Sequence, residues 1–232
     1  MEAIILAGGF GTRLKSKIKS IPKPMAPINN RPFLDYIFDY LKKHSISHAI
    51  LSVYHKSEII KQYYNNNYDS IKITYSNDKM PLGTGGAIKA ALRKTIYENI
   101  IVINGDTYFE IAVDQLLESH ITNNNHITIA LKPMSNFSRY GFVRTKDNGS
   151  VIEFKEKEFK ENGNINGGIC IIKNTIFNEY NGVDFFLFSD FIADNLTRLK
   201  IGSVIFDELF IDIGTPEDLL LAPGLLKSIN FK

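Results

Sequence analysis

The first loop of the chain, LAGGFGTRLKSKIKSIPKPM, combines three glycines with basic residues and follows a short apolar run. Gly8, Gly9 and Gly11 have no Cβ, so their backbone N–H groups can approach a ligand closely and form a concave surface for phosphate. Arg13 adds a forked cation, and Lys23 adds a point charge between two prolines. These residue types together predict a phosphate-binding loop.

Two common glycine motifs do not describe this loop. The Walker pattern, G-x-x-x-x-G-K-[ST], has no match in it. The dinucleotide pattern G-x-G-x-x-G, started at Gly9, requires a third glycine where the chain has Leu14. The sequence therefore indicates a phosphate loop of another kind.

Two aspartates follow apolar runs and are candidate metal ligands. Asp106 follows residues 100–103, and Asp212 follows residues 209–211. Taken singly, each could be a helix cap or a turn residue, but carboxylates plus substrate phosphates are also the usual ligands of Mg²⁺. Because parallel strands end at one edge of a sheet, we expect both carboxylates there, sharing one Mg²⁺.

Composition excludes several classes of protein. The 232 residues carry a net charge of +2, and the lysines and arginines are dispersed, which argues against nucleic-acid binding. No apolar stretch is long enough to cross a membrane, and no secretory leader is evident, so we expect a cytoplasmic protein. The single cysteine, Cys170, lies between two isoleucines and is predicted to be a small buried hydrophobe.

Strands and helices are expected to alternate up to about residue 125, which predicts an α/β fold with a mostly parallel central sheet and helices on both faces. The expected strands are 2–6, 48–54, 71–75 and 99–105, and the expected helices begin near 32, 56 and 83. The rest of the chain is predicted to be strand-rich, with strands at 126–133, 140–145, 150–157, 166–173, 202–206 and 209–214, and helices at 189–199 and 215–222. No linker is evident, so we expect one domain over 1–232 with two halves, about 1–125 and about 126–232.

Several motifs occur together along nearly the whole chain. LAGGFGTRL with PKPM resembles the signature of the sugar-1-phosphate nucleotidylyltransferases. PLGTGGA, NGDT, YGFV, EFKEK, NGGI and DIGTPED follow in the order of that family. The resemblance implies a Rossmann-like nucleotidyltransferase fold in which the first half binds the nucleotide and the second half binds the sugar phosphate.

The resemblance also implies roles for particular residues. It implies catalytic roles for Arg13, Lys23 and Asp106, and an Mg²⁺ site at Asp106 and Asp212. The implied nucleotide-binding residues are Leu6, Ala7, Gly8, Gly9, Gly11, Thr12, Arg13, Lys23, Gly83 and Thr84. The implied sugar-phosphate-binding residues are Tyr140, Gly141, Glu156, Lys157 and Asn166.

The stretch around Glu156 and Lys157 is weaker evidence than the other motifs. EFKEKEFKE, considered alone, is typical of a solvated ribbon, and only the resemblance moves its residues toward the sugar phosphate. Glu158 stands where the family often has proline, so the turn there departs from the family pattern.

The implied reaction transfers a nucleotidyl group from a nucleoside triphosphate to a sugar 1-phosphate and releases pyrophosphate. The PLGTGGA form, the FIDIGTPED ending and the short chain most resemble the branch that uses GTP and D-glycero-α-D-manno-heptose 1-phosphate. UTP, dTTP or CTP with a hexose 1-phosphate remain alternatives, because base and sugar rest on resemblance alone. The sequence is compatible with a homo-oligomer.

Two other classes remain open. A metal-dependent glycosyltransferase also has an acidic strand end, but it normally shows Asp-x-Asp, whereas this chain has Gly105-Asp106-Thr107. A nucleotide-sensing domain without catalysis could use the same fold, because fold does not determine function. Retention of both candidate metal-binding aspartates argues against a sensor.

Overall fold

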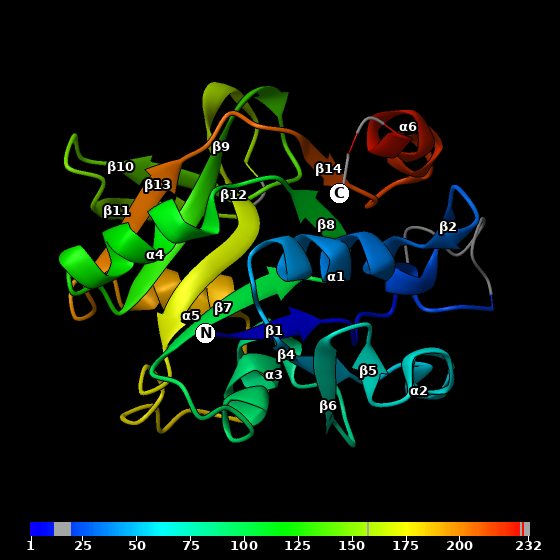
Figure 1. Cartoon of the computed structure of the whole chain (residues 1–232). Coiled ribbons are helices and arrows are strands. Elements are labelled where there is room, and N and C mark those ends of the chain that lie inside the picture. The colour runs from blue at the N-terminus through cyan, green and yellow to red at the C-terminus, as the bar shows by residue number, and fades with distance from the viewer. Residues whose placement is uncertain (12–19, 157, 228, 230–232) are drawn as a thin grey trace.

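The computed structural model describes residues 1–11, 20–156, 158–227 and 229. The elements of the first half are β1 (Glu2–Leu6), the 3-10 turn η2 (Lys23–Met25), β2 (Pro27–Ile28), β3 (Arg31–Pro32), α1 (Phe33–Lys43), β4 (His48–Val53), α2 (Ser57–Tyr64), β5 (Asn67–Tyr68), β6 (Ile71–Asn77), α3 (Gly83–Leu92), β7 (Asn99–Asn104), β8 (Thr107–Phe109) and α4 (Val113–Thr122) (Figure 1). The remaining elements are β9 (Ile127–Phe137), β10 (Phe142–Thr145), β11 (Val151–Lys155), β12 (Lys160–Lys173), α5 (Phe188–Asp194), β13 (Ile201–Ile205), β14 (Phe210–Asp212) and α6 (Pro216–Lys227).

One large sheet runs through both halves of the chain. Its strand order, within the described residues, is β11-β10-β12-β7-β1-β4-β6-β5, with β9 on β12 and β13 on β9. Strands β7, β1, β4 and β6 are parallel, as predicted, because apolar runs such as Ile100–Ile103 are buried on both faces. The α/β fold with a mostly parallel centre is confirmed, and antiparallel pairing dominates the strand-rich half.

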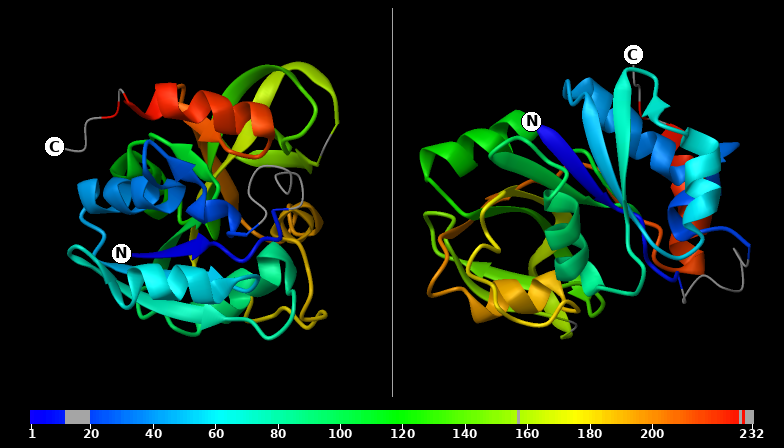
Figure 2. Two further views of the ribbon diagram at one scale, coloured as in Figure 1. Left: turned by 90° about the vertical axis from the view of Figure 1, so that its right-hand side faces the viewer. Right: turned by 90° about the horizontal axis from the view of Figure 1, so that it is seen from below.

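Helices cover both faces of this sheet, as predicted. Alternate residues of β1 divide between two apolar cores, with Ala3 and Ile5 in one and Ile4 in the other. Residues of α1, α2, α4 and α6 belong to the first core, and residues of α3 and α5 belong to the second. Figure 2 shows helices on both sides of the sheet. The period of two along the strand places successive side chains on opposite faces.

The single cysteine lies in the second core. Cys170 is buried on β12, and burial raises the pKa of its thiol to about 12. A thiol that stays neutral is a poor nucleophile, so the prediction of a small buried hydrophobe is confirmed. Within the described residues, no helix is both long and apolar enough to span a bilayer.

Candidate active site

A close contact between the backbone after β7 and the end of β1 places Asp106 beside the first loop. The N–H of Gly105 donates to the carbonyl of Leu6 at 3.0 Å, which joins the end of β7 to the end of β1. A Cβ at Gly105 would lie 2.7 Å from that same carbonyl oxygen, so only glycine fits here. The turn after β7 can therefore carry Asp106 directly past the carboxyl end of β1.

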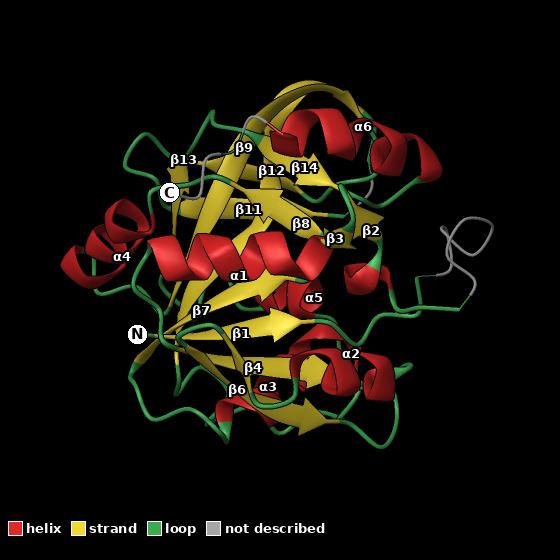
Figure 3. Cartoon of the chain, turned by 45° about the vertical axis from the view of Figure 1, so that its right-hand side comes forward, coloured by secondary structure: helices red, strands yellow, loops and turns green. Residues whose placement is uncertain are grey.

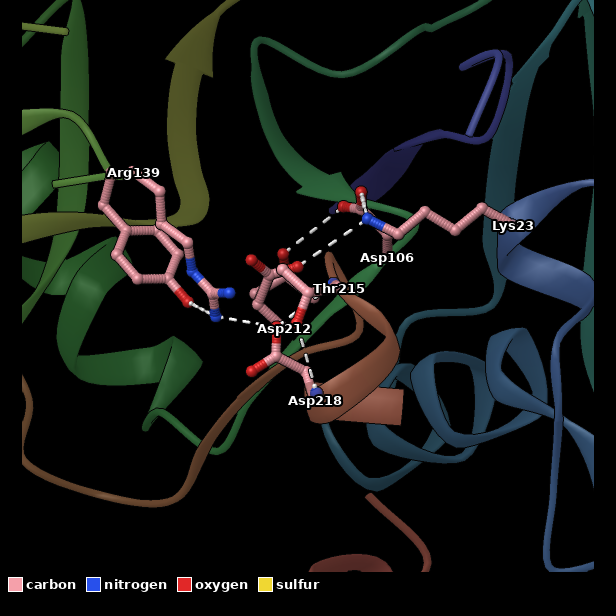
Figure 4. A network of polar contacts seen from close by, with 8 residues as sticks. Lys23, Asp106, Arg139, Asp212, Thr215 and Asp218 are labelled. Carbon is pink, nitrogen blue, oxygen red and sulfur yellow. Dashed lines mark hydrogen bonds and ion pairs between the residues drawn. The ribbon is translucent and has the colours of Figure 1, made fainter. Parts of the chain in front are cut away.

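Lys23 lies between the two candidate metal-binding carboxylates. Its ammonium nitrogen is 2.5 Å from Asp106 Oδ2 and 3.7 Å from Asp212 Oδ1, and its side chain is buried (Figure 4). The 3-10 turn η2, closed by a hydrogen bond from the Met25 N–H to the Pro22 carbonyl, holds the backbone of Lys23. In this structure Lys23 neutralises carboxylates, whereas the sequence indicated only a phosphate-facing cation.

Asp212 reaches this site by a route that differs from the sequence prediction. It does not end a strand of the parallel sheet; it is the last residue of β14, which pairs antiparallel with β8 in a separate two-stranded ribbon (Figure 3). In that ribbon Asp212 is opposite Thr107, the neighbour of Asp106. The expected edge of parallel strands is therefore wrong for Asp212, although the two carboxylates do come together as predicted.

The electrostatics of the carboxylate pair favour a cation. Burial, and next the negative charge of Asp106, raise the pKa of Asp212, while Lys23 acts in the opposite direction. In the described part of the chain, no third His, Cys, Asp or Glu joins the pair as a possible metal ligand. Two carboxylates suit Mg²⁺, because this ion usually takes few protein ligands and completes its shell with phosphate oxygens and water. The donor set therefore fits the predicted ion.

The first loop brings its glycines beside β4 and Lys23. Ala7 donates its N–H to the Ser52 carbonyl at 2.8 Å, and a Cβ on Gly8 would lie 3.1 Å from the Tyr54 nitrogen. Gly11 has a φ of +58°, and its Cβ would meet the Cβ of Lys23 at 3.4 Å. Leu6, Ala7 and Gly8 thus lie at the carboxyl ends of β1 and β4, and Gly11 lies beside Lys23.

Three of the predicted nucleotide-binding residues have no described contact in the first loop. Gly9 is exposed, and a Cβ added to it would have no neighbour within 4 Å among the described residues. Thr12 and Arg13 lie outside the described residues, so their predicted contacts with the triphosphate remain predictions.

The second glycine-rich loop is anchored to the segment before α5. Gly83 has a φ of +70°, and a Cβ there would lie 2.4 Å from the carbonyl oxygen of Phe186. The same oxygen accepts the N–H of Gly85 at 3.0 Å, and Thr84 Oγ1 accepts the N–H of Phe188 at 2.9 Å. These contacts fix the start of α3, while the base contact expected of Gly83 and Thr84 remains a prediction.

Predicted residues from both halves line one small cavity. Leu6 and Thr84 from the first half face Glu156 and Asn166 from the second half around a space of about 120 Å³. The N–H of Asn166 donates to the carbonyl of Gly141 at 2.9 Å, so the YGFV and NGGI motifs adjoin. Lys157 lies outside the described residues.

Tyr140 lies on the carboxylate side of the site. Burial, and next the charge of Asp212, raise the pKa of Tyr140 to about 12. Its hydroxyl accepts a hydrogen bond from Arg139 Nη2 at 2.6 Å, and its ring meets Phe210 of β14 edge-on. Tyr140 therefore links the segment between β9 and β10 to the strand that carries Asp212.

Sequence reasoning missed two charged residues near the site. Arg139 precedes the YGFV motif and pairs with Asp218, and Asp78 begins the segment between β6 and the PLGTGGA loop. Asp78 is partly buried at the carboxyl end of β6, and burial raises the pKa of its carboxyl to about 6. Both residues lie next to sequence motifs, which could have marked them as candidates, but the sequence did not show which groups Arg139 and Asp78 would face.

The chain is similar to nucleotidyltransferases over nearly its whole length. The family model described as nucleotidyl transferase matches residues 2–226. D-glycero-alpha-D-manno-heptose 1-phosphate guanylyltransferase from Campylobacter jejuni is 51% identical over 94% of this chain and 96% of the relative. The protein of the same name from Aneurinibacillus thermoaerophilus is 50% identical over 94% of this chain and 95% of the relative.

A solved structure agrees with this similarity. HddC from Yersinia pseudotuberculosis superposes with a TM-score of 0.87 at 33% identity, covering 97% of this chain and 99% of that one. The same protein complexed with GMP-PN gives a TM-score of 0.84 at 35% identity over 97% of this chain and 99% of that one. The fold, the carboxylate–lysine cluster and these matches agree, and the chain belongs to the nucleotidyl transferase family.

Proposed function

We propose that the protein transfers a guanylyl group from GTP to D-glycero-α-D-manno-heptose 1-phosphate and releases pyrophosphate. The observation that carries this proposal is the cluster of Lys23, Asp106 and Asp212 just past the carboxyl end of β7. Gly11 of the glycine loop lies beside Lys23, and Leu6, which lines the cavity of Glu156 and Asn166, accepts the Gly105 N–H. A 51% identical relative is named for this reaction. The proposed division of labour gives the nucleotide to residues 1–125 and the sugar phosphate to residues 126–232.

The proposed chemistry is an in-line displacement at the α-phosphorus of GTP. An oxygen of the sugar phosphate forms the new bond to that phosphorus, and the bond from the α-phosphorus to the bridging oxygen of the β-phosphate breaks. A phosphomonoester has a second pKa of about 6, so the attacking group is largely dianionic at neutral pH and needs no general base. Catalysis then consists of positioning and charge neutralisation.

Particular residues supply these two effects in the proposal. Asp106 and Asp212 would hold Mg²⁺, which when bound withdraws charge from the phosphate oxygens. Lys23 and Arg13 would hold the triphosphate and stabilise the charge on the departing pyrophosphate. Lys157 would orient the sugar phosphate, beside Tyr140, Gly141, Glu156 and Asn166. Because nucleoside triphosphates are cytoplasmic metabolites, we propose the cytoplasm as the location of the reaction.

A panel of substrates tests the reaction and both substrates at once. GTP, ATP, UTP, dTTP and CTP are each combined with the heptose 1-phosphate, mannose 1-phosphate and glucose 1-phosphate in the presence of Mg²⁺, and pyrophosphate is measured. We expect the highest kcat/KM for GTP with the heptose 1-phosphate. Preference for UTP or dTTP would reject the proposed base but keep the reaction class. Nucleotide binding without pyrophosphate release from any pair would favour a sensor or a glycosyltransferase.

Asp78 offers a physical basis for the choice of guanine. Its carboxylate has no hydrogen-bond partner within the described residues, and the strand before it ends at the same edge as β4, where the Asp78 N–H donates to the Val53 carbonyl at 3.1 Å. Guanine presents two adjacent donors, N1–H and the N2 amino group, and a carboxylate can accept both. We therefore propose that Asp78 accepts these donors from the base of GTP.

Asp78→Asn is expected to lower kcat/KM for GTP by about ten- to a hundredfold, because hydrogen bonds to a charged group contribute about 1.5–3 kcal/mol. ITP lacks the N2 amino group, so the preference of the wild-type enzyme for GTP over ITP should shrink in the variant. Asp184→Asn, an exposed aspartate in the loop before α5, is the control. An unchanged GTP-to-ITP ratio in Asp78→Asn would reject this assignment.

A further inference from the structure

Arg139 connects the segment between β9 and β10 to the start of α6. It lies between β9 and β10, in the segment that continues into Tyr140 and Gly141. Its Nη2 is 2.7 Å from Asp218 Oδ2 and donates to the Tyr140 hydroxyl at 2.6 Å (Figure 4). One guanidinium therefore joins the segment proposed to face the sugar phosphate to the helix that follows Asp212.

Asp218 is also the residue that closes the first turn of α6. Its Oδ2 accepts the N–H of Thr215 at 3.1 Å and the Thr215 hydroxyl at 2.9 Å, while its own N–H donates to Thr215 Oγ1 at 3.3 Å. This reciprocal arrangement is a capping box, in which both residues satisfy backbone donors of the helix end. The oxygen that binds Arg139 thus also fixes Thr215.

Thr215 is separated from Asp212 by a short stretch of tightly constrained chain. The N–H of Ile213 donates to the Asp106 carbonyl at 3.1 Å. A Cβ on Gly214 would lie 2.8 Å from Asp212 Oδ2, so the backbone of Gly214 is already close to that carboxylate. Gly214, whose backbone adjoins the Asp212 carboxylate, is thus the residue directly before Thr215.

Arg139 lines a cavity near the end of β9. This cavity of about 400 Å³ is lined by Phe137 at the end of β9, by Asp218 and Leu221 of α6, and by Arg139. The Arg139–Asp218 ion pair is therefore a direct contact between the β9–β10 segment and α6 at this cavity. The edge-on contact of the Tyr140 and Phe210 rings, 5.7 Å between centroids, also borders the cavity.

We infer that Arg139 is a positioning residue for the metal site: acting through Asp218 and Thr215, it holds Asp212 at the distance from Asp106 that a shared Mg²⁺ requires. The inference rests on the proposed function. It also predicts that the sugar-phosphate segment and Asp212 move together, because Tyr140 and Asp218 share the same guanidinium. Groups that orient metal ligands typically change metal affinity or activity by about ten- to a hundredfold when they are removed.

Arg139→Gln tests the inference, because it removes the charge and keeps much of the side-chain length. We expect the Mg²⁺ concentration for half-maximal rate to rise about tenfold and the KM for the sugar 1-phosphate to rise with it, with kcat largely restored at high Mg²⁺. The second readout is hydrogen–deuterium exchange in the metal-free, ligand-free protein, where amides of residues 210–218 should exchange about tenfold faster. GTP binding measured calorimetrically in EDTA should stay within about twofold of wild type.

Matched variants distinguish a role of Arg139 in positioning Asp212 from a general loss of structure. Arg144→Gln breaks a comparable ion pair to Glu153, 2.7 Å long and on β10, and should change neither readout. Asp218→Asn should reproduce the effect of Arg139→Gln, and the double variant should be little worse than either single variant. Arg139→Lys keeps the positive charge but lacks the forked guanidinium, so its Mg²⁺ requirement and its exchange rates should lie between those of wild type and Arg139→Gln. This variant replaces Arg139→Gln in the test if Arg139→Gln does not fold.

Two results would overturn the inference. The first is that Arg139→Gln needs a half-saturating Mg²⁺ concentration within about twofold of wild type. This result would overturn the inference even if hydrogen–deuterium exchange became faster, because a purely structural role of Arg139 predicts faster exchange with unchanged use of Mg²⁺. The other is unchanged exchange over residues 210–218. If the wild-type protein transferred no nucleotide to any sugar phosphate, the proposed function would fail instead, and the exchange measurement would still report on the link between Arg139 and Asp212.

Discussion

Asp106→Asn and Asp212→Asn should each lower kcat by roughly a hundredfold or more, because each removes a charge that holds the proposed Mg²⁺ without changing the shape of the side chain. The two carboxylates flank one ammonium, at 2.5 Å and 3.7 Å, so they are close enough to serve one ion. If both act through that ion, the double variant should be little worse than the poorer single variant. Initial rates against Mg²⁺ concentration for the three variants provide the measurement.

The controls for this experiment are built into the same titration. Raised Mg²⁺ should partly rescue the single variants, since weaker binding of the ion is the expected cause of the loss. Asp114→Asn, an exposed aspartate in the first turn of α4, should behave as wild type. Losses that multiply in the double variant, or full activity in either single variant, would show that the two carboxylates do not form a common site.

Lys23→Met should lower both the activity and the stability of the protein. The substitution removes the buried ammonium between two carboxylates, so kcat/KM for GTP is expected to fall about ten- to a hundredfold through loss of a charge-assisted contact worth about 1.5–3 kcal/mol. In the metal-free protein the uncompensated carboxylates repel each other, so the free energy of unfolding should also fall.

Mg²⁺ should change the free energy of unfolding of Lys23→Met and of wild type by different amounts. Urea unfolding in EDTA should show Lys23→Met to be less stable than wild type, and Mg²⁺ should recover more stability in the variant than in wild type, because a dication replaces the missing charge. Lys43→Met, which breaks an exposed ion pair with Glu110, is the matched control and should show neither effect. Equal responses to Mg²⁺ in Lys23→Met and wild type would mean that Lys23 does not neutralise the metal-binding carboxylates.

The α/β architecture was predictable because its signals are local. The buried runs of β1, β4 and β7 and the amphipathic pattern of α1 each lie within a few residues, and short strands alternating with helices favour parallel pairing. The capping box at Thr215 and Asp218 also lies within one helical turn, and α6 begins at Pro216, one residue after the predicted start of the helix at 215. Such features depend on backbone preferences that neighbouring residues determine.

The arrangement of the site was less predictable, because it depends on contacts between distant segments. Asp212 meets Asp106 through the β14–β8 ribbon, and nothing in either apolar run distinguishes such a ribbon from one more parallel strand. Lys23 was predicted as a cation for phosphate, but only its position in η2 brings it between two carboxylates. The role inferred for Arg139 likewise requires knowledge of where α6 packs.

By itself the sequence determined the fold class, the family resemblance and the residue types available for phosphate and metal binding, since these follow from short patterns and from the order of motifs along the chain. The tertiary structure decided which of those residues share a site. It brought Lys23, Asp106 and Asp212 within ion-pair distance, and it joined Arg139 to the helix beyond Asp212. The physical reason is that ionic contacts act over a few ångströms in space, and only the folded chain brings residues so far apart in sequence to that distance.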